Sequence, residues 1–416
     1  MRRNARSGAT AVGDPSPSGR IPRRMSRPSD RRRAAVIVID ACGAGALPDA
    51  PAYGDPADAN TIAHVAEDAG GLHLPTFERL GLGSIVAVQG VPPAADPALH
   101  GRLHPLGPGK DSTTGHWELM GVVVDAPLPT YPDGFPAGLV ADLEQATGMR
   151  FCANRPADGL AIIDELGEHH LETGDVILYT SADSVLQLAA HDDVVPEPEL
   201  HAACEAAREV MRGEHAVGRV IARPFRGTPG SFTRTGGRRD YSLEPPRRSY
   251  LVELHDAGVP VHAVGKIRDL FAGVGIDRKH TATTNEEGLA ATTALLRDLD
   301  AGLIFTNLVE TDQVYGHRHD VSGFAYALER IDAAVGGWLD TLLGPGDLLV
   351  LTADHGVDPR APHTDHTREH APLLAVFAGD GGRRHDGPLA DVGASTLDWL
   401  TGRDAPALPG TSFIGP

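Results

Sequence analysis

AAVIVID (34–40) is a run of six apolar residues that ends in an aspartate. A strand with no polar alternation is buried on both faces, as the strands of parallel sheets are. In open α/β sheets the ligands gather beyond the carboxyl ends of such strands. We therefore expect 34–39 to be a central strand and Asp40 to face a functional site.

The same form recurs along the chain. AGLIFTNL (301–308) precedes Asp312, and DLLVLTADHG (347–356) leads into Asp354 and His355. Strand and helix therefore alternate, which predicts a doubly wound α/β core sheet. Further strands are expected at 259–266 and 372–379, and helices at 286–299 and 323–343.

The middle of the chain has a different character. It opens with a proline-rich passage, APLPTYPDGFP (126–136), and closes with another, YSLEPPRR (241–248). Strands are expected between them at 175–181 and 218–225, and a helix at 199–212. We interpret 126–246 as an inserted smaller α/β cap domain between stiff linkers, and 34–125 with 247–416 as the core.

Charge is distributed unevenly. Residues 1–33 hold ten arginines and two acids, a net charge of +8. Because the whole chain carries −19, the remaining residues carry −27. The arginine-rich tail is predicted to be disordered, and a start at Met25 is an alternative interpretation. A body this acidic repels phosphate chains, which excludes general nucleic-acid binding.

The sequence gives no sign of a membrane or of an oxidising compartment. No apolar run approaches the roughly 20 residues of a membrane span. Cys42, Cys152 and Cys204 are far apart and form no CxxC pair, which fits a reducing cytoplasm. The oligomeric state is left open, and a monomer is compatible with the sequence.

Acids and histidines cluster at the strand ends. Taken singly, Asp40 could be a helix cap and His317 a surface histidine or a hydrogen-bonded core histidine. Taken together, three carboxylates and three imidazoles suit Mn²⁺ or Zn²⁺ and are enough for two ions. Asp312 and His317 are five residues apart, on different faces of an ideal helix, so we expect them on a loop. The candidate ligands are Asp40, Asp312, His317, Asp354, His355 and His366.

GKDSTTGHWE (109–118) offers three consecutive hydroxyls, Ser112, Thr113 and Thr114. A hydroxyl becomes nucleophilic when a base or metal lowers its pKa, and a two-metal site does this while clamping a phosphoryl group. Another interpretation is a Ser or Thr helix cap before TGHWELMG, which is compatible with the first because helix N-termini favour phosphate. The residues alone do not separate the three hydroxyls.

Several long motifs together resemble phosphopentomutase, of the alkaline phosphatase superfamily, over nearly all of 34–416. The resemblance implies that Asp40, Asp354 and His355 hold one Mn²⁺ near the nucleophile, and Asp312, His317 and His366 the other. The motifs are GKDSTTGHWE, YTSADSVLQLAAHDD (179–193), GRVIARPF (218–225), FTRT (232–235), VYGHRHD (314–320), TADHG and TDHTRE.

The resemblance also implies roles outside the metal site. Ser112 is the nucleophile, where the family usually has Thr. Ser181, Asp183, Arg219 and Lys266 bind the sugar phosphate. GGRRD (236–240) departs from the family's usual stretch after FTRT.

The activity implied is the interconversion of α-D-ribose 1-phosphate and ribose 5-phosphate, and of the 2-deoxy pair, through a phosphoserine and a pentose bisphosphate. The implied cofactors are two Mn²⁺, with other divalent ions as alternatives, and a sugar bisphosphate activator. A metal-dependent phosphomonoesterase is the rival activity, and a non-catalytic binding protein is the second rival.

Overall fold

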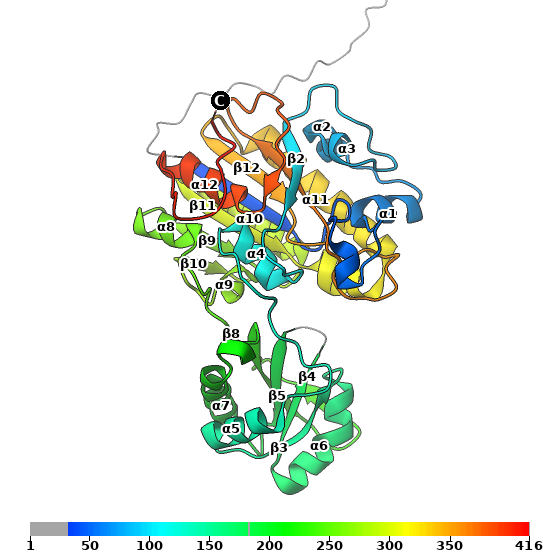
Figure 1. The fold of residues 1–416 in the computed structure, drawn as a ribbon, viewed down its shortest axis with the longest axis vertical. Helices are drawn as coiled ribbons and strands as arrows, with labels where there is room; N and C mark the ends of the chain where they lie inside the picture. Colours follow the sequence, from blue (N-terminus) through cyan, green and yellow to red (C-terminus); the bar gives the residue numbers. More distant parts are fainter. Residues whose placement is uncertain (1–31, 182–183, 416) are drawn as a thin grey trace, which may run out of the picture.

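The computed structural model describes residues 32–181 and 184–415, and the tail predicted to be disordered lies outside them up to residue 31. Two sheets form two lobes (Figure 1). The larger sheet has the order β10-β9-β11-β1-β12-β13-β2-β14. Its strands are β1 Arg33–Ile39, β2 Leu99–His104, β9 Val261–Val264, β10 Arg278–His280, β11 Gly302–Leu308, β12 Asp347–Thr352, β13 Ala371–Val376 and β14 Gly387–Pro388.

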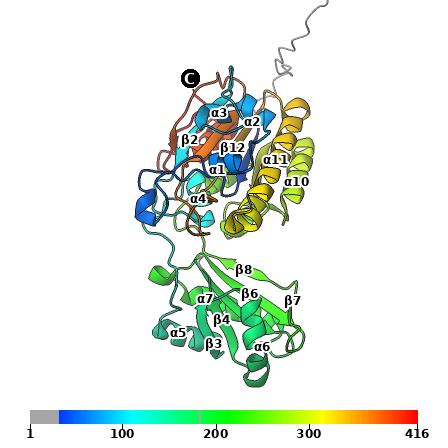
Figure 2. The same ribbon diagram turned by 90° about the vertical axis from the view of Figure 1, so that its right-hand side faces the viewer.

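The larger sheet confirms the predicted α/β class. Its strands are parallel except for β13, which runs antiparallel to both β12 and β2. Helices α10 and α11 lie on one face, and α8 and α12 on the other (Figures 1 and 2). These four helices are α8 Tyr250–Asp256, α10 Asn285–Asp298, α11 Val321–Thr341 and α12 Asp391–Thr401.

The register of the sheet gathers the predicted acids at one edge. β1 lies between β11 and β12, with Ile39 opposite Leu308 and Val38 opposite Thr352. Asp40, Asp354 and the turn after Leu308 therefore leave the sheet side by side. The helices near this edge are α1 Thr61–Asp68, α2 Pro75–Leu80, α3 Leu82–Ile85, α4 Ser112–Leu119 and α9 Ile267–Leu270.

β1 begins at Arg33, which the sequence interpretation wrongly assigned to the disordered tail. Arg33 is 1% exposed. Its guanidinium donates to Asp347 through Nε (2.8 Å) and Nη2 (2.9 Å), and further to the Leu299 carbonyl. A buried charge is tolerated when it is paired and hydrogen-bonded in this way.

The smaller sheet has its own apolar clusters and lies below the larger one in Figure 1. Its strands are β3 Phe151–Pro156, β4 Val176–Thr180, β5 Val185–His191, β6 Arg219–Arg226, β7 Thr233–Arg234 and β8 Arg239–Ser242. Its helices are α5 Ala137–Thr147, α6 Ala161–Thr173 and α7 Glu197–Val210. All of these elements lie between residues 137 and 242, and the domain limits 126 and 246 stay a prediction.

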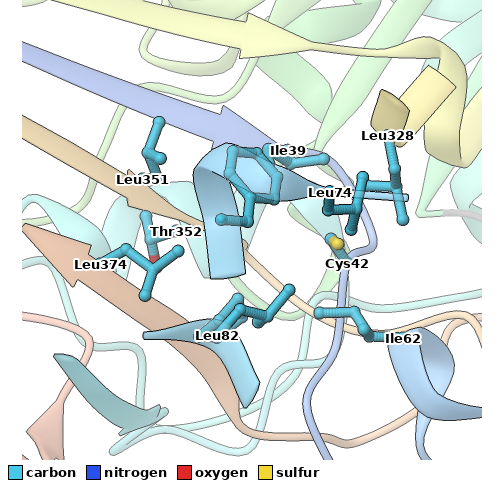
Figure 3. A pocket seen from close by; sticks show the side chains of 11 residues that line it. Ile39, Cys42, Ile62, Leu74, Leu82, Leu328, Leu351, Thr352 and Leu374 are labelled. Atoms are coloured by element: carbon cyan, nitrogen blue, oxygen red, sulfur yellow. The ribbon is translucent and has the colours of Figure 1, made fainter. Parts of the chain in front are cut away.

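A small apolar cavity lies beside the ends of β1 and β12 (Figure 3). Its volume is about 20 Å³, and its lining is apolar apart from Cys42 and Thr352. An apolar void without convergent polar partners holds no ordered water. Burial raises the pKa of the Cys42 thiol, so this cysteine is an inert core residue.

Candidate active site

Helix α4 presents Ser112 at its first turn. The Asp111 side chain caps the helix by accepting hydrogen bonds from the Thr113 (2.9 Å) and Thr114 (3.1 Å) backbone N–H groups. The Thr114 hydroxyl donates to the same carboxylate at 2.7 Å. Asp111 is therefore the cap, and the alternative that a hydroxyl of this stretch caps the helix is wrong.

The Ser112 hydroxyl is oriented toward the strand ends. Its Oγ lies 3.1 Å from His355 Nε2 and 3.5 Å from Asp40 Oδ1. Thr114, by contrast, is tied into the helix cap. These contacts distinguish Ser112 from Thr114 without reference to any family.

His116 lies one helical turn after Ser112 and was not singled out from the sequence. It is fully buried. Its Nδ1 donates to the Ser112 carbonyl (2.8 Å) and lies 3.0 Å from Asp354 Oδ2. His116 thus joins the nucleophile's backbone to a predicted metal ligand, and the i, i+4 spacing within α4 was the signal that could have revealed it.

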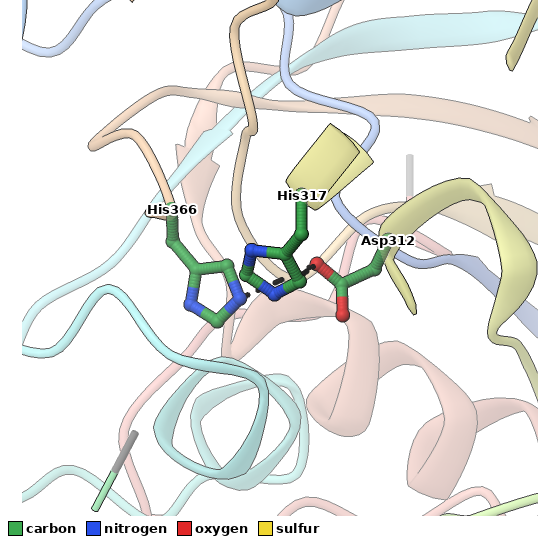
Figure 4. Close-up of side chains that lie close together, drawn as sticks. All are labelled: Asp312, His317 and His366. Atoms are coloured by element: carbon green, nitrogen blue, oxygen red, sulfur yellow. Dashed lines mark ion pairs between the residues drawn. The ribbon is translucent and has the colours of Figure 1, made fainter. Parts of the chain in front are cut away.

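Asp312, His317 and His366 converge on one point (Figure 4). The Nε2 atoms of both histidines lie 3.3 Å from Asp312 Oδ1. The other ring nitrogen of His317 donates to the Thr364 carbonyl at 2.6 Å. Such a bond fixes the tautomer and leaves Nε2 available to bind a metal.

We expected Asp312 and His317 on a loop, but both lie in helical turns. Thr311–Tyr315 is a π-helical turn, and Gly316–Arg318 is a 3₁₀ turn. Asp312 therefore lies in the π turn and His317 in the 3₁₀ turn that follows it, so the two residues do not belong to one regular helix. The spacing argument failed because it assumed 3.6 residues per turn.

A second group lies deeper. Asp40, Asp312 and His355 bring one ligand atom each within 4.8 Å of one another. Asp354 Oδ2 lies 3.3 Å from His355 Nε2, and His355 Nδ1 donates to the Gly356 carbonyl at 3.1 Å. The structure therefore brings all six predicted ligands together, while their division between two ions stays a prediction.

The electrostatics of this site fit bound cations. Burial, followed by the charges of Asp354 and Asp312, raises the pKa of Asp40 well above its usual range. Burial would also raise the pKa of Asp312 and of Asp354, but the imidazoles beside each lower it below its ordinary value. Asp354 Oδ2 receives no hydrogen bond of good geometry from the described residues. Divalent ions would offset this crowding of carboxylates, and the mixed Asp/His donor set suits them.

A pocket of about 170 Å³ opens over Ser112. Arg219 at the start of β6 and Lys266 after β9 line it from the two lobes. Ser181 follows β4, is half-buried and does not belong to the lining, while Asp183 lies outside the described residues. Other lining residues that the sequence did not indicate include Asp111, Ser184 and Gln313.

Comparisons with known proteins agree with this geometry. Residues 32–402 match the metalloenzyme superfamily. The phosphopentomutase of Caldanaerobacter subterraneus subsp. tengcongensis is 48% identical over 388 residues, covering 92% of this chain and 97% of that protein. The phosphopentomutase of Anaeromyxobacter sp. strain K is 49% identical over 391 residues, covering 92% and 98%.

The chain belongs to the phosphopentomutase family. The resemblance drawn from the motifs is thereby confirmed, and so are the expectations of an isomerase and of a metal-binding enzyme. A solved phosphoglycerate mutase from Leishmania mexicana is similar over 92% of this chain and 97% of that chain, with 14% identity and a TM-score of 0.47, which is too weak to add to the assignment. None of the described helices is both long and apolar enough to cross a membrane.

Proposed function

We propose that the enzyme interconverts α-D-ribose 1-phosphate and ribose 5-phosphate, and the 2-deoxy pair, through phospho-Ser112 and a pentose bisphosphate. The observation that carries the proposal is the approach of Ser112 Oγ to His355 Nε2 (3.1 Å) and Asp40 Oδ1 (3.5 Å). Membership of the phosphopentomutase family supplies the substrate class.

The site residues divide the work. Phospho-Ser112 donates its phosphoryl group to a free hydroxyl of the bound sugar, and the proton of that hydroxyl passes to Ser112 Oγ, which restores the serine hydroxyl. The resulting bisphosphate then returns its other phosphoryl group to Ser112 Oγ, which releases the isomeric monophosphate. A sugar bisphosphate activator loads Ser112 before the first turnover.

Two metal ions belong to this proposal, with Mn²⁺ as the first choice. When bound by Asp40, Asp354 and His355 and by Asp312, His317 and His366, they would spread the charge of the transferring group and lower the serine pKa.

Arg219 and Lys266 bind the phosphate that is not reacting, together with Ser181 and Asp183 on the sugar side. Cations at the junction of two lobes suit a phosphate ester. Closing the smaller lobe over the sugar would exclude water, which would otherwise turn transfer into hydrolysis. A cytoplasmic location is part of the proposal, because Cys42, Cys152 and Cys204 are free thiols.

The test starts with Mn²⁺-loaded enzyme, a trace of sugar bisphosphate and ribose 5-phosphate, followed by ³¹P NMR. We expect ribose 1-phosphate to accumulate; free phosphate without ribose 1-phosphate would instead identify a phosphomonoesterase. Ser112→Ala should abolish transfer with unchanged metal content, while Thr113→Ala keeps the phosphoenzyme. Tandem mass spectrometry that located the phosphate on Thr113 would refute the assignment of Ser112.

A further inference from the structure

A second and larger cavity adjoins the pocket over Ser112. Its volume is about 710 Å³. Arg219, Lys266, Leu270 and Gln313 line both spaces, so the two share a wall. The larger one lies between β8 of the smaller sheet and the segment from β9 to β10 of the larger sheet. We call it the basic chamber.

The basic chamber concentrates positive charge in an acidic protein. Seven cationic side chains line it against two carboxylates, Asp240 and Asp269, whereas the whole chain carries −19. Such a concentration of one sign of charge in a concave site attracts anions. The cations are Arg208, Arg219, Arg238, Arg239, Lys266, Arg268 and Lys279.

The two carboxylates orient cations and do not neutralise the chamber. Asp240 accepts two hydrogen bonds from Arg238, at 2.7 and 2.8 Å, and lies 3.6 Å from Arg219. Asp269 accepts from Lys279 at 2.9 and 3.0 Å. Side chains held this way lose less rotamer entropy when an anion binds.

The reaction pocket alone does not explain these cations. Arg219 and Lys266 already serve a phosphate beside Ser112, whereas Arg268 and Lys279 line only the chamber. A monophosphate in the pocket over Ser112 does not reach Arg268 or Lys279, because neither residue lines that pocket. A sugar bisphosphate carries two phosphate groups and must present each in turn to Ser112. A second anion site can bind one phosphate group while the other is near Ser112.

We propose that the basic chamber is a holding site for the sugar bisphosphate, which withdraws past Arg219 and Lys266, is retained by Arg268 and Lys279, and re-enters with its other phosphate leading. This inference rests on the proposed function and concerns only the handling of its intermediate. It identifies Arg268 and Lys279 as residues that distinguish a bisphosphate from a monophosphate.

The test compares two ligands on the same protein. Full-length, Mn²⁺-loaded enzyme carrying Ser112→Ala, which prevents turnover, is titrated calorimetrically with ribose 1,5-bisphosphate and with ribose 5-phosphate. Adding Arg268→Gln and Lys279→Gln should raise the Kd of the bisphosphate about five- to tenfold at low salt and that of the monophosphate less than about twofold. Arg278→Gln is the matched control, because Arg278 neighbours Lys279 on β10 but does not line the chamber.

A second measurement follows the intermediate during turnover. In enzyme that retains Ser112, the Arg268→Gln/Lys279→Gln pair should release more labelled bisphosphate into the filtrate of a quenched reaction than the parent or the control does. Equal losses of affinity for both ligands, or no change for either, would overturn the holding site while leaving the proposed function intact. A parent protein that binds neither sugar phosphate would overturn both.

Discussion

Replacing Gly115 by alanine tests whether the packing of α4 on the end of β12 sets the position of Ser112. A Cβ at Gly115 would lie 2.5 Å from the Asp354 carbonyl oxygen, 2.9 Å from Asp354 Cβ and 3.0 Å from its carbonyl carbon. Ordinary contacts begin near 3.4 Å. Because two of the three atoms are backbone, α4 and Asp354 must separate by about 1 Å, a misplacement worth roughly 100-fold in rate.

Stability should change less than activity. Overpacking costs about 1–3 kcal/mol, and replacing glycine by alanine inside a helix returns about 1 kcal/mol. We therefore expect Gly115→Ala to unfold slightly earlier in a thermal melt, and to turn over ribose 5-phosphate roughly 100 times more slowly in the ³¹P NMR assay.

Gly138→Ala is the matched control. Gly138 lies in α5, and a Cβ there would meet nothing within 4 Å. This variant should keep full turnover and gain about 0.5–1 kcal/mol of stability. A Gly115→Ala enzyme with more than half of the parent rate would refute the idea that this contact positions the nucleophile.

Three further predictions concern charge and metal. Asp347→Ala leaves the buried Arg33 guanidinium unpaired and should cost about 3–5 kcal/mol in urea denaturation. Asp354→Asn should lower metal content and turnover together, because it removes a carboxylate from a buried ligand set. Burial lowers the pKa of His170 below its ordinary 6.5, so the unfolded state binds the proton first and stability should fall as the pH drops below about 6.5.

Each of these has a result that would contradict it. Asp347→Ala should leave turnover near the parent value at low temperature, and a melt unchanged from the parent would mean that Arg33 finds other partners. Full metal content in Asp354→Asn, measured by plasma mass spectrometry, would exclude Asp354 as a ligand. His170→Gln should flatten the pH dependence of stability, and an unchanged slope would assign that dependence to other groups.

The central strands and their terminal acids could be predicted because their signal is local. A run such as AAVIVI has no polar position to turn toward solvent, so β1 and the position of Asp40 at its carboxyl end follow from the local sequence alone. The direction of β13 could not be predicted in this way, because a buried strand has the same continuous apolar sequence whether its neighbours are parallel or antiparallel. β3 of the smaller sheet was missed for another reason: it is only half-buried and its residues are mixed in character.

The site was predictable in its chemistry and less so in its geometry. Six ligands could be listed from carboxylates and histidines after strands, but the change from a π turn to a 3₁₀ turn between Asp312 and His317 could not be predicted from their spacing. His116 was missed because a buried histidine that bonds a backbone carbonyl looks, in sequence, like any histidine on a helix.

The positions of the strands along the chain determine when the metal-binding site can form during synthesis. All strands of the smaller sheet lie between residues 151 and 242, so that lobe can close while the ribosome is still adding β9. β1 is made first of all but pairs with β11 and β12, which end at residues 308 and 352. At a synthesis rate of about 10 residues per second, His366 is added roughly half a minute after Asp40. A nascent chain stopped before β11 therefore carries a finished small lobe beside an unpaired, strongly apolar strand, which exposes the chain to aggregation until β11 is added.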